Sequence, residues 1–173
     1  MKPVLQDGEK VLRDIALPVT KEMFGSKELA TMLSQMKESL DSQKDGLALA
    51  APQIGIPYRI FIVRLDRLEY PKEGEVLPAV NVAFINPEII KHSRRKEYVD
   101  EGCLSVRGLY GKTLRYERAT VRAYDEQGKV FERGGGGVLA QAYQHEIDHL
   151  DGILFIDHAE DIVEDERFKA HES

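Results

Sequence analysis

Cysteine and long apolar runs are the features that this sequence has least of. A single cysteine, Cys103, among 173 residues excludes an internal disulfide, so the fold needs no oxidising compartment. No apolar run approaches the ~18 to 20 residues that a membrane-spanning helix requires. The first residues also lack the basic-then-apolar order of a signal peptide. We therefore expect a cytosolic protein without a membrane segment.

Internal repeats and low-complexity blocks are absent too, apart from four glycines at positions 134–137. This run lacks the Gly-Lys-Ser/Thr ending of a phosphate-binding loop, so we expect it to be a flexible connector. With 42% hydrophobic and 31% charged residues, the composition is that of an ordinary globular protein. At about 150 residues per domain, residues 1–173 predict a single domain.

The negative charge is concentrated near the C-terminal end. Residues 157–173 contain seven acidic and two basic side chains, whereas the rest of the chain has 22 basic and 23 acidic ones. This balance excludes a basic surface spread over the whole protein, and we expect no sequence-specific contact with nucleic acid. Residues from about 158 to 173 are expected to form an acidic tail or a short surface helix.

The apolar spacing predicts an α+β fold. Residues 27–43 repeat apolar side chains at steps of three and four, as an amphipathic helix does. Residues 138–150 predict a second helix that stops near Gly152. Residues 45–55 are small and end in Pro and Gly, so they should be extended or looped. Alternating β-branched and aromatic residues predict strands at 58–65, 83–90, 113–124 and, after a turn, 130–132.

The second predicted helix carries the motif His-Glu-x-x-His. At 3.6 residues per turn, His145 and His149 lie one above the other on one face, so both imidazoles can bind one metal ion. Glu146 follows the first histidine and can accept a proton from water on that ion. A five-residue pattern also arises by chance, so a pair of surface histidines remains an alternative. The other histidines are expected at the surface: His92, His158 and His171.

A third ligand would complete such a site, because catalytic zinc-like centres use three protein ligands and leave one position for water. Cys103, in the polar turn expected at 101–105, offers a thiol, although a lone cysteine is more often a small buried hydrophobe. A metalloprotease is the rival interpretation, since residues 145–152 also fit HExxHxxG. The longer protease signature needs a histidine three residues further on. This chain has Phe155 there, which weakens the rival.

Three segments together resemble the peptide deformylase family. That family carries a Gly-φ-Gly-Leu-Ala-Ala-x-Gln segment, a Glu-Gly-Cys-Leu-Ser segment and a Gln-His-Glu-x-Asp-His-Leu segment in this order. They match residues 46–53, 101–105 and 144–150. The resemblance implies a single α+β domain in which antiparallel or mixed sheets pack around a central HExxH helix. It implies a hydrolase that removes the formyl group from the N-terminal formylmethionine of nascent polypeptides and releases formate.

The resemblance also implies a role for each residue of the site. The implied metal ligands are Cys103, His145 and His149. Glu146 is implied as general base and acid for the attack of metal-bound water, and Gln53 with the Leu104 N–H as the donors that stabilise the oxyanion. Metal-bound imidazoles usually donate their second N–H to an acceptor. Three residues are expected to provide this support around the ligands: Glu101, Gln144 and Asp148.

The cofactor implied by the resemblance is one divalent metal ion, with Fe²⁺ expected and Zn²⁺, Ni²⁺ or Co²⁺ as substitutes. A thiolate ligand tolerates both iron and zinc. The implied partners are N-formylmethionyl peptides and nascent chains in a bacterial-type cytoplasm or an organelle. Contact with the ribosome stays open. Docking through the acidic tail is disfavoured, because ribosomal RNA is an anion as well.

Substrate contacts are expected from two segments. By resemblance, the substrate backbone lies like an added strand along the small-residue segment, with contacts at Gly46, Ala48 and Leu49. Helix geometry places Val138 and Ala142 on the face of His145, where they can line a pocket for methionine or belong to the core.

Two residues depart from the family pattern. Ala48 stands where the family usually has its second Gly, and Arg107 replaces a common proline. Arg107 is expected to change loop stiffness or to place a cation at the cleft rim. A catalytically silent relative that binds N-terminal peptides is a further alternative. The presence of Glu146, Gln53 and Cys103 counts against it.

Overall fold

A computed structural model describes residues 1–69 and 78–166. In this part of the chain, two helices and eight strands are joined by loops and single turns of 3-10 helix. The helices are α1 (Lys27–Asp41) and α2 (Gly137–Leu150). The strands are β1 (Ala48–Ala50), β2 (Ile60–Arg64), β3 (Asn81–His92), β4 (Lys96–Cys103), β5 (Val106–Tyr116), β6 (Arg118–Tyr124), β7 (Val130–Gly136) and β8 (Glu160–Glu164). The 3-10 turns are η1 (Lys10–Leu12), η2 (Lys21–Met23), η3 (Ala51–Ile54), η4 (Leu65–Leu68) and η5 (Phe155–Asp157).

Helix α1 begins where the sequence provides an N-cap. The Ser26 hydroxyl accepts a hydrogen bond from the Leu29 N–H at 3.1 Å, which satisfies one free donor of the first turn. The predicted apolar face is buried in the core beside β1 and η3. The helix ends at Asp41, two residues before the predicted end. Beyond it, Arg67 Nη1 donates to the Gln43 carbonyl at 2.7 Å and stabilises the loop.

A five-stranded antiparallel sheet has the order β1-β2-β3-β6-β7. Strand β2 is buried at every residue, as expected for an inner strand covered on both faces. Phe61 stacks on Phe84 with ring centroids 4.6 Å apart, and the Tyr143 ring of α2 meets Phe84 edge-on at 5.4 Å. The predicted strands at 58–65 and 83–90 are confirmed as β2 and β3. Strand β1 lies at one edge of this sheet.

The single strand predicted at 113–124 is wrong, because two strands of different sheets occupy it. Strand β5 belongs to a second antiparallel sheet of order β4-β5-β8, and β6 belongs to the first sheet. The chain changes sheets at Glu117, whose N–H donates to the Arg95 carbonyl at 3.3 Å. The alternation of apolar residues continues from β5 into β6 through Glu117. The sequence pattern therefore does not show that the two strands are separate, and only their different pairing partners do.

Strand β4 is absent from the predicted elements. Its first residues are polar and exposed, so the hydrophobic pattern does not show it. The turn expected at 101–105 is therefore the end of β4 and the tight connection to β5, where Cys103 pairs with Val106.

The glycines at 134–137 are not the flexible connector that was expected. Gly134, Gly135 and Gly136 pair with β6 as the end of β7, and Gly137 starts α2 with a φ of +55°. A Cβ on Gly135 would lie 2.6 Å from Leu139 Cδ2. The missing side chains therefore let the first turn of α2 pack closely on the strand that precedes it.

For the acidic tail or short helix expected at about 158–173, the structure shows a strand at Glu160–Glu164 instead, and residues 167–173 lie outside the described residues. Strand β8 pairs with β5, placing Glu160 opposite Lys112 and Glu164 opposite Leu109. Opposite charges across an antiparallel pair support this register. A Cβ on Gly111 would lie 3.0 Å from Ala159 Cβ. The missing side chain at Gly111 therefore leaves room for the segment before β8 to pack closely on β5. His171 lies outside the described residues.

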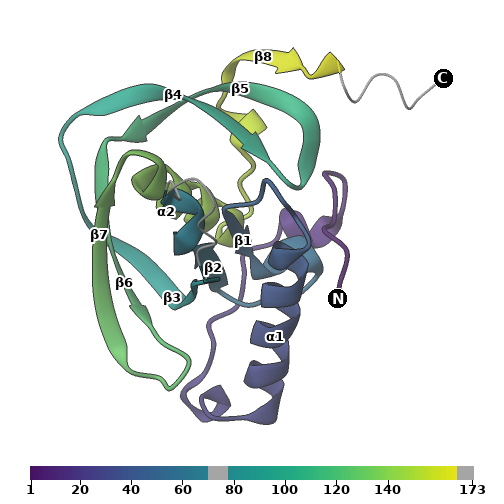
Figure 1. Cartoon of the computed structure of the whole chain (residues 1–173), viewed down its shortest axis with the longest axis vertical. Coiled ribbons are helices and arrows are strands. Elements are labelled where there is room, and N and C mark those ends of the chain that lie inside the picture. Colours follow the sequence, from purple (N-terminus) through teal and green to yellow (C-terminus); the bar gives the residue numbers. More distant parts are fainter. Residues whose placement is uncertain (70–77, 167–173) are drawn as a thin grey trace.

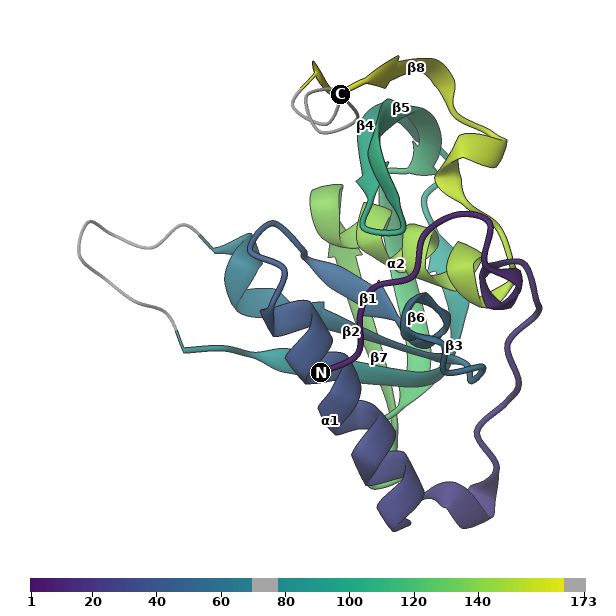
Figure 2. The same cartoon turned by 90° about the vertical axis from the view of Figure 1, so that its right-hand side faces the viewer.

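Helix α2 contacts strands of both sheets. Figures 1 and 2 show the β4–β5 hairpin covering one side of this helix, while α1 extends away from the hairpin. The prediction of an α+β fold with antiparallel sheets is confirmed. Within the described residues, neither helix combines the length and hydrophobicity that crossing a bilayer requires.

Candidate functional site

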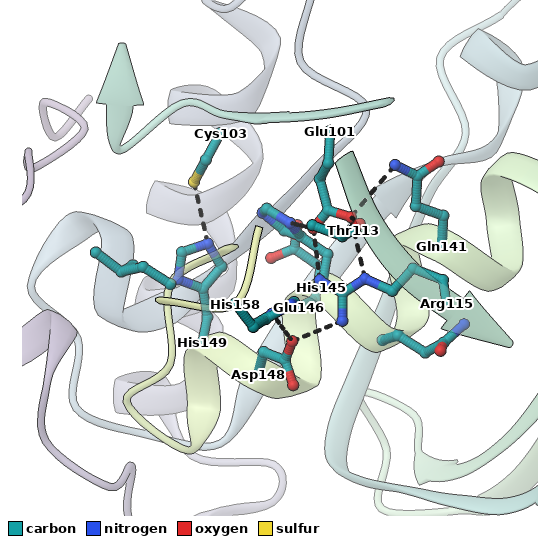
Figure 3. A network of polar contacts seen from close by, with 12 residues as sticks. Glu101, Cys103, Thr113, Arg115, Gln141, His145, Glu146, Asp148, His149 and His158 are labelled. Carbon is teal, nitrogen blue, oxygen red and sulfur yellow. Dashed lines mark hydrogen bonds and ion pairs between the residues drawn. The ribbon is translucent and has the colours of Figure 1, made fainter. Parts of the chain in front are cut away.

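Three potential metal ligands converge between the end of β4 and α2. One ligand atom from each of Cys103, His145 and His149 lies within 4.8 Å of the other two. Cys103 Sγ is 3.2 Å from His149 Nε2, and the two imidazole rings are 4.8 Å apart at 77°. Figure 3 shows the thiol and the rings facing one another. One thiol and two imidazoles form a donor set that suits a divalent transition metal.

The His145 ring is held by a buried carboxylate. Glu101 Oε1 accepts a hydrogen bond from His145 Nδ1 at 2.5 Å, which turns Nε2 toward the ligand cluster. Glu101 also accepts hydrogen bonds from Arg115 Nε at 3.0 Å and from Thr113 Oγ1 at 2.5 Å. Burial alone would raise the pKa of Glu101, but the bonds from His145 and Arg115 outweigh it and hold the pKa well below its usual range. Figure 3 shows this carboxylate at the centre of the polar network.

The two histidines have opposite electrostatic surroundings. Burial lowers the pKa of His145, but contacts with Cys103 and Glu101 outweigh burial and raise it well above its usual value. Burial and the neighbouring His145 lower the pKa of His149 well below the usual value. A lowered pKa favours the neutral imidazole, which is the form that binds a metal, whereas the raised pKa of His145 means that a metal bound there would displace a proton. Its Nδ1 is buried without a hydrogen-bond partner among the described residues.

Glu146 is a buried carboxyl group beside the ligands. Its side chain is 4% exposed, and Oε1 lies 4.0 Å from His145 Nε2. Among the described residues, Oε2 has no hydrogen-bond partner. Burial raises the pKa of Glu146 to about 7, with His145 opposing and Glu101 reinforcing the shift. A carboxyl group with this pKa can take up and release a proton near neutral pH.

Gln53 is fixed next to the thiol. Its Oε1 accepts a hydrogen bond from the Ala50 N–H at 2.8 Å, and its Nε2 donates to Ser105 Oγ at 3.1 Å. These two bonds orient the amide so that Nε2 lies 3.7 Å from Cys103 Sγ. Buried in η3, this side chain directs N–H donors toward the site.

A cleft of about 470 Å³ opens beside the ligand cluster. Its walls come from the segment leading into β1, from the β4–β5 hairpin and from α2. Seven predicted site residues outside the ligand cluster line it: Gly46, Ala48, Gln53, Leu104, Val138, Ala142 and Glu146. Leu49 does not, because its side chain is fully buried in the core cluster that includes α1. Only the backbone of Leu49 is left for a contact with substrate.

The edge of β1 faces this cleft. The Leu47 carbonyl accepts a hydrogen bond from the Arg64 N–H at 2.8 Å. The backbone N–H and C=O of Leu47 therefore point toward β2. Backbone groups alternate in direction along an antiparallel strand. Ala48 and Ala50 therefore point theirs toward the open edge, where Gln53 already binds the Ala50 N–H.

Two of the three expected supporting residues do not contact the ligand rings. Asp148 accepts from Arg115 Nη1 at 2.7 Å, and Gln144 binds the backbone of Tyr116. Of the three, only Glu101 contacts a ligand ring. The supporting residues Thr113 and Arg115 were missed. They are two residues apart on β5, so their side chains lie on the same face of the strand. This spacing points to Glu101 only once β4 is known to pair with β5, and β4 was not predicted.

Residues 1–165 match the family described as polypeptide deformylase. The chain belongs to this family. Among sequence relatives, the peptide deformylase of Acidobacterium capsulatum is 43% identical over 156 residues, 90% of this chain and 85% of the relative. That of Halothermothrix orenii is 42% identical over 158 residues, 90% of this chain and 93% of the relative.

Solved deformylase structures have the same fold. The Met-Ala-Ser-bound class I type b peptide deformylase from Acinetobacter baumannii has a TM-score of 0.79 and 34% identity, covering 91% of this chain and 98% of that chain. A peptide deformylase from Legionella pneumophila has a TM-score of 0.79 and 35% identity, with coverages of 93% and 87%. As a deformylase, the chain is a hydrolase of protein biosynthesis that removes formyl groups from polypeptide N-termini. The metalloprotease and silent alternatives are not favoured.

Proposed function

We propose that Cys103, His145 and His149 hold one divalent metal ion and that Glu146 is the general base and acid of deformylation. The observation that carries this proposal is the convergence of a thiol and two imidazoles beside a buried carboxyl group. When bound, the ion would supply an electrophile and lower the pKa of water from ~15.7 toward ~7.

Ferrous iron is the ion that we propose, with Zn²⁺, Ni²⁺ or Co²⁺ as functional substitutes. The thiolate of Cys103 adds negative charge and a soft donor, which two neutral imidazoles would not supply. The fixed ring of His145, held by Glu101 at 2.5 Å, supports a preorganised site.

Glu146 moves the proton that the reaction requires. It accepts a proton as water oxygen bonds to the formyl carbon, and it passes this proton to the amine nitrogen as the C–N bond breaks. The products are formate and a free peptide N-terminus. Burial raises the pKa of Glu146, which favours its return of the proton to the amine nitrogen.

Gln53 Nε2 and the Leu104 N–H stabilise the oxyanion of the tetrahedral intermediate. The bond between Gln53 Oε1 and the Ala50 N–H at 2.8 Å supports this role, because it prevents the amide from turning away. Loss of one such donor typically costs ~3 to 4 kcal/mol of transition-state stabilisation.

The substrate is the N-formylmethionyl end of a polypeptide, bound as an added strand at the free edge of β1. Outward backbone groups at Ala48 and the small residue Gly46 support this placement. Leu49 takes part only through its backbone. Val138, exposed on α2, and the buried Ala142 form the wall that receives the methionine side chain.

The place of action that we propose is a bacterial-type cytoplasm or an organelle where N-formylmethionyl chains are made. The bacterial relatives support this placement. Nascent chains are the partners, and a transient contact with the ribosome would bring them to the enzyme.

The test measures formate release from formyl-Met-Ala-Ser together with the metal content of anaerobically prepared protein. Glu146→Gln is expected to keep its metal and to lose about 10²- to 10⁴-fold in turnover, as removal of a general base does. Cys103→Ala is expected to lose most of its metal. His158→Ala, which removes an exposed imidazole outside the cluster, is the matched control and should retain metal and activity.

Different outcomes would contradict different parts of the proposal. Full metal occupancy in Cys103→Ala removes the thiol from the ligand set. Turnover of Glu146→Gln equal to that of the parent removes its proton-transfer role. Activity that survives complete removal of metal by a chelator excludes the metal-dependent mechanism.

A further inference from the structure

The cationic side chain of Arg107 lies on the wall of the cleft. Among the described residues that line it, Arg107 is the only lysine or arginine. Its side chain is exposed at the start of β5, and one guanidinium nitrogen donates to Gln43 Oε1. The Gln43 amide is neutral, so this bond positions the guanidinium without compensating its charge.

Three of the four carboxylates that line the cleft are paired or buried. Asp100 is paired with Lys112 at 3.0 Å, and the carboxyl groups of Glu101 and Glu146 are buried. Asp45 is exposed on the wall that leads into β1. Arg107 is therefore the one cationic side chain that the described wall residues present to a bound peptide.

The direction of β1 relates this charge to a bound peptide. Strand β1 runs toward Gln53 and the ligand cluster, so a peptide pairing antiparallel to it leaves the cluster in the opposite direction, past Ala48 toward Gly46 and Gln43. At ~3.3 Å per residue, a methionine beside Ala48 places the second and third residues beside the segment from Gly46 to Gln43. Arg107 reaches Gln43 from the opposite wall.

We propose that Arg107 determines specificity beyond the methionine, favouring N-formylated peptides with an acidic side chain at the second or third position and disfavouring lysine there. This inference rests on the proposed function, because it needs formylmethionine bound beside Ala48. Arg107 would attract a glutamate side chain of the peptide and repel a lysine side chain. The ratio of kcat/KM for the glutamate peptide to that for the lysine peptide therefore contains both effects.

The experiment compares peptides that differ only in one charge. Formyl-Met-Ala-Ser, formyl-Met-Glu-Ser, formyl-Met-Lys-Ser, formyl-Met-Ala-Glu and formyl-Met-Ala-Lys, all amidated at the C-terminus, are assayed for formate release. We expect kcat/KM for glutamate to exceed that for lysine by about three- to tenfold at one of the two positions, mainly through KM. Raising the salt to about 0.5 M should reduce this ratio, because salt screens exposed charges.

Three variants test the role of Arg107. Arg107→Gln should bring the ratio close to one, and Arg107→Glu should invert it. Gln43→Glu should reduce it, because the new carboxylate would pair with Arg107. Arg94→Gln is the matched control, since it removes an exposed arginine on the β3–β4 connection, and it should keep the parental ratio.

A ratio near one in the parent, or an unchanged ratio in Arg107→Gln, overturns the inference. Failure of the metal-loaded parent to deformylate any of the five peptides would contradict the proposed function instead. In that case, calorimetric affinities of Met-Ala-Glu and Met-Ala-Lys amides still test Arg107, because binding alone should show the same preference and lose it in Arg107→Gln.

Discussion

Arg115 is a buried cation shared between two carboxylates. Its side chain is 6% exposed; Nη2 lies 2.5 Å from Glu101 Oε1, and Nη1 lies 2.7 Å from Asp148 Oδ2. The residue contacts neither ring of the ligand pair. It holds Glu101, which holds His145, so its effect on the site passes through packing and charge rather than through contact with substrate.

Replacing Arg115 by methionine is expected to lower the free energy of unfolding by ~3 to 5 kcal/mol, because a buried carboxylate would lose its cation. Urea unfolding of the metal-loaded protein measures this. The matched control is Arg122→Met, since Arg122 is half-exposed and pairs with Glu132 at 3.2 Å; its loss should cost at most ~1 kcal/mol. Equal losses in the two variants would show that burial of the ion pair does not matter.

At the scale of elements, the C-terminal end of α2 depends on Gly152. This residue has a φ of +75°, a conformation that costs little only for glycine. Its N–H donates to the His149 carbonyl at 3.2 Å. A Cβ at this position would lie 2.4 Å from the Arg13 carbonyl oxygen. The glycine therefore ends the helix and also lets the N-terminal segment pass close to the ligand-bearing turn.

Gly152→Ala is expected to destabilise the protein more than a matched control with the same backbone conformation. Gly25 has a φ of +77° and no atom within 4 Å of its added Cβ, so Gly25→Ala measures the conformational cost alone, ~1 to 2 kcal/mol. Gly152→Ala adds a clash with backbone. Thermal unfolding of both variants should give the larger drop in melting temperature for Gly152→Ala, and the reverse order would rule out the close approach.

At the scale of the whole molecule, an ion cluster of the largely buried Arg64 and Asp66 with the half-exposed Asp41 joins the end of α1 to the sheet. Arg64 donates to Asp41 and Asp66, and the Asp66 carboxylate accepts from the Val80 N–H at 2.9 Å. Hydrogen bonds from Arg64 lower the pKa of Asp66 to about 2. Because the folded pKa is depressed, this carboxylate stabilises the fold above pH ~4 and loses that contribution as the pH falls toward 2.

Asp66→Asn should therefore remove a stability contribution on the order of 2 kcal/mol at pH 6. Urea unfolding at several pH values should show the difference between parent and variant shrinking from pH 4 toward pH 2. Asp14→Asn is the control, since Asp14 is exposed and paired with Lys10, and it should cost less than ~0.5 kcal/mol at pH 6. A difference for Asp66→Asn that grows on acidification would have the wrong sign for a depressed pKa.

The parts of the site that sequence predicted are those encoded within one helix. His145, Glu146 and His149 stand in a single helical repeat, so their relative position follows from helix geometry alone. The place of Cys103 beside them rested on the family resemblance. Local patterns could not show Arg115 binding Glu101, because that contact depends on how β4 pairs with β5.

Local chemistry is enough to predict both helices, the inner strands β2 and β3, and the types of the proposed ligand atoms, because periodicity and side-chain chemistry act over a few residues. Folding in three dimensions adds what those patterns leave open: the change of sheet at Glu117, the pairing of acidic β8 with β5, and the reach of Arg107 to Gln43. Each of these contacts depends on which segments pair in the folded chain. Its stability depends on the partner segment, which the local sequence pattern does not identify.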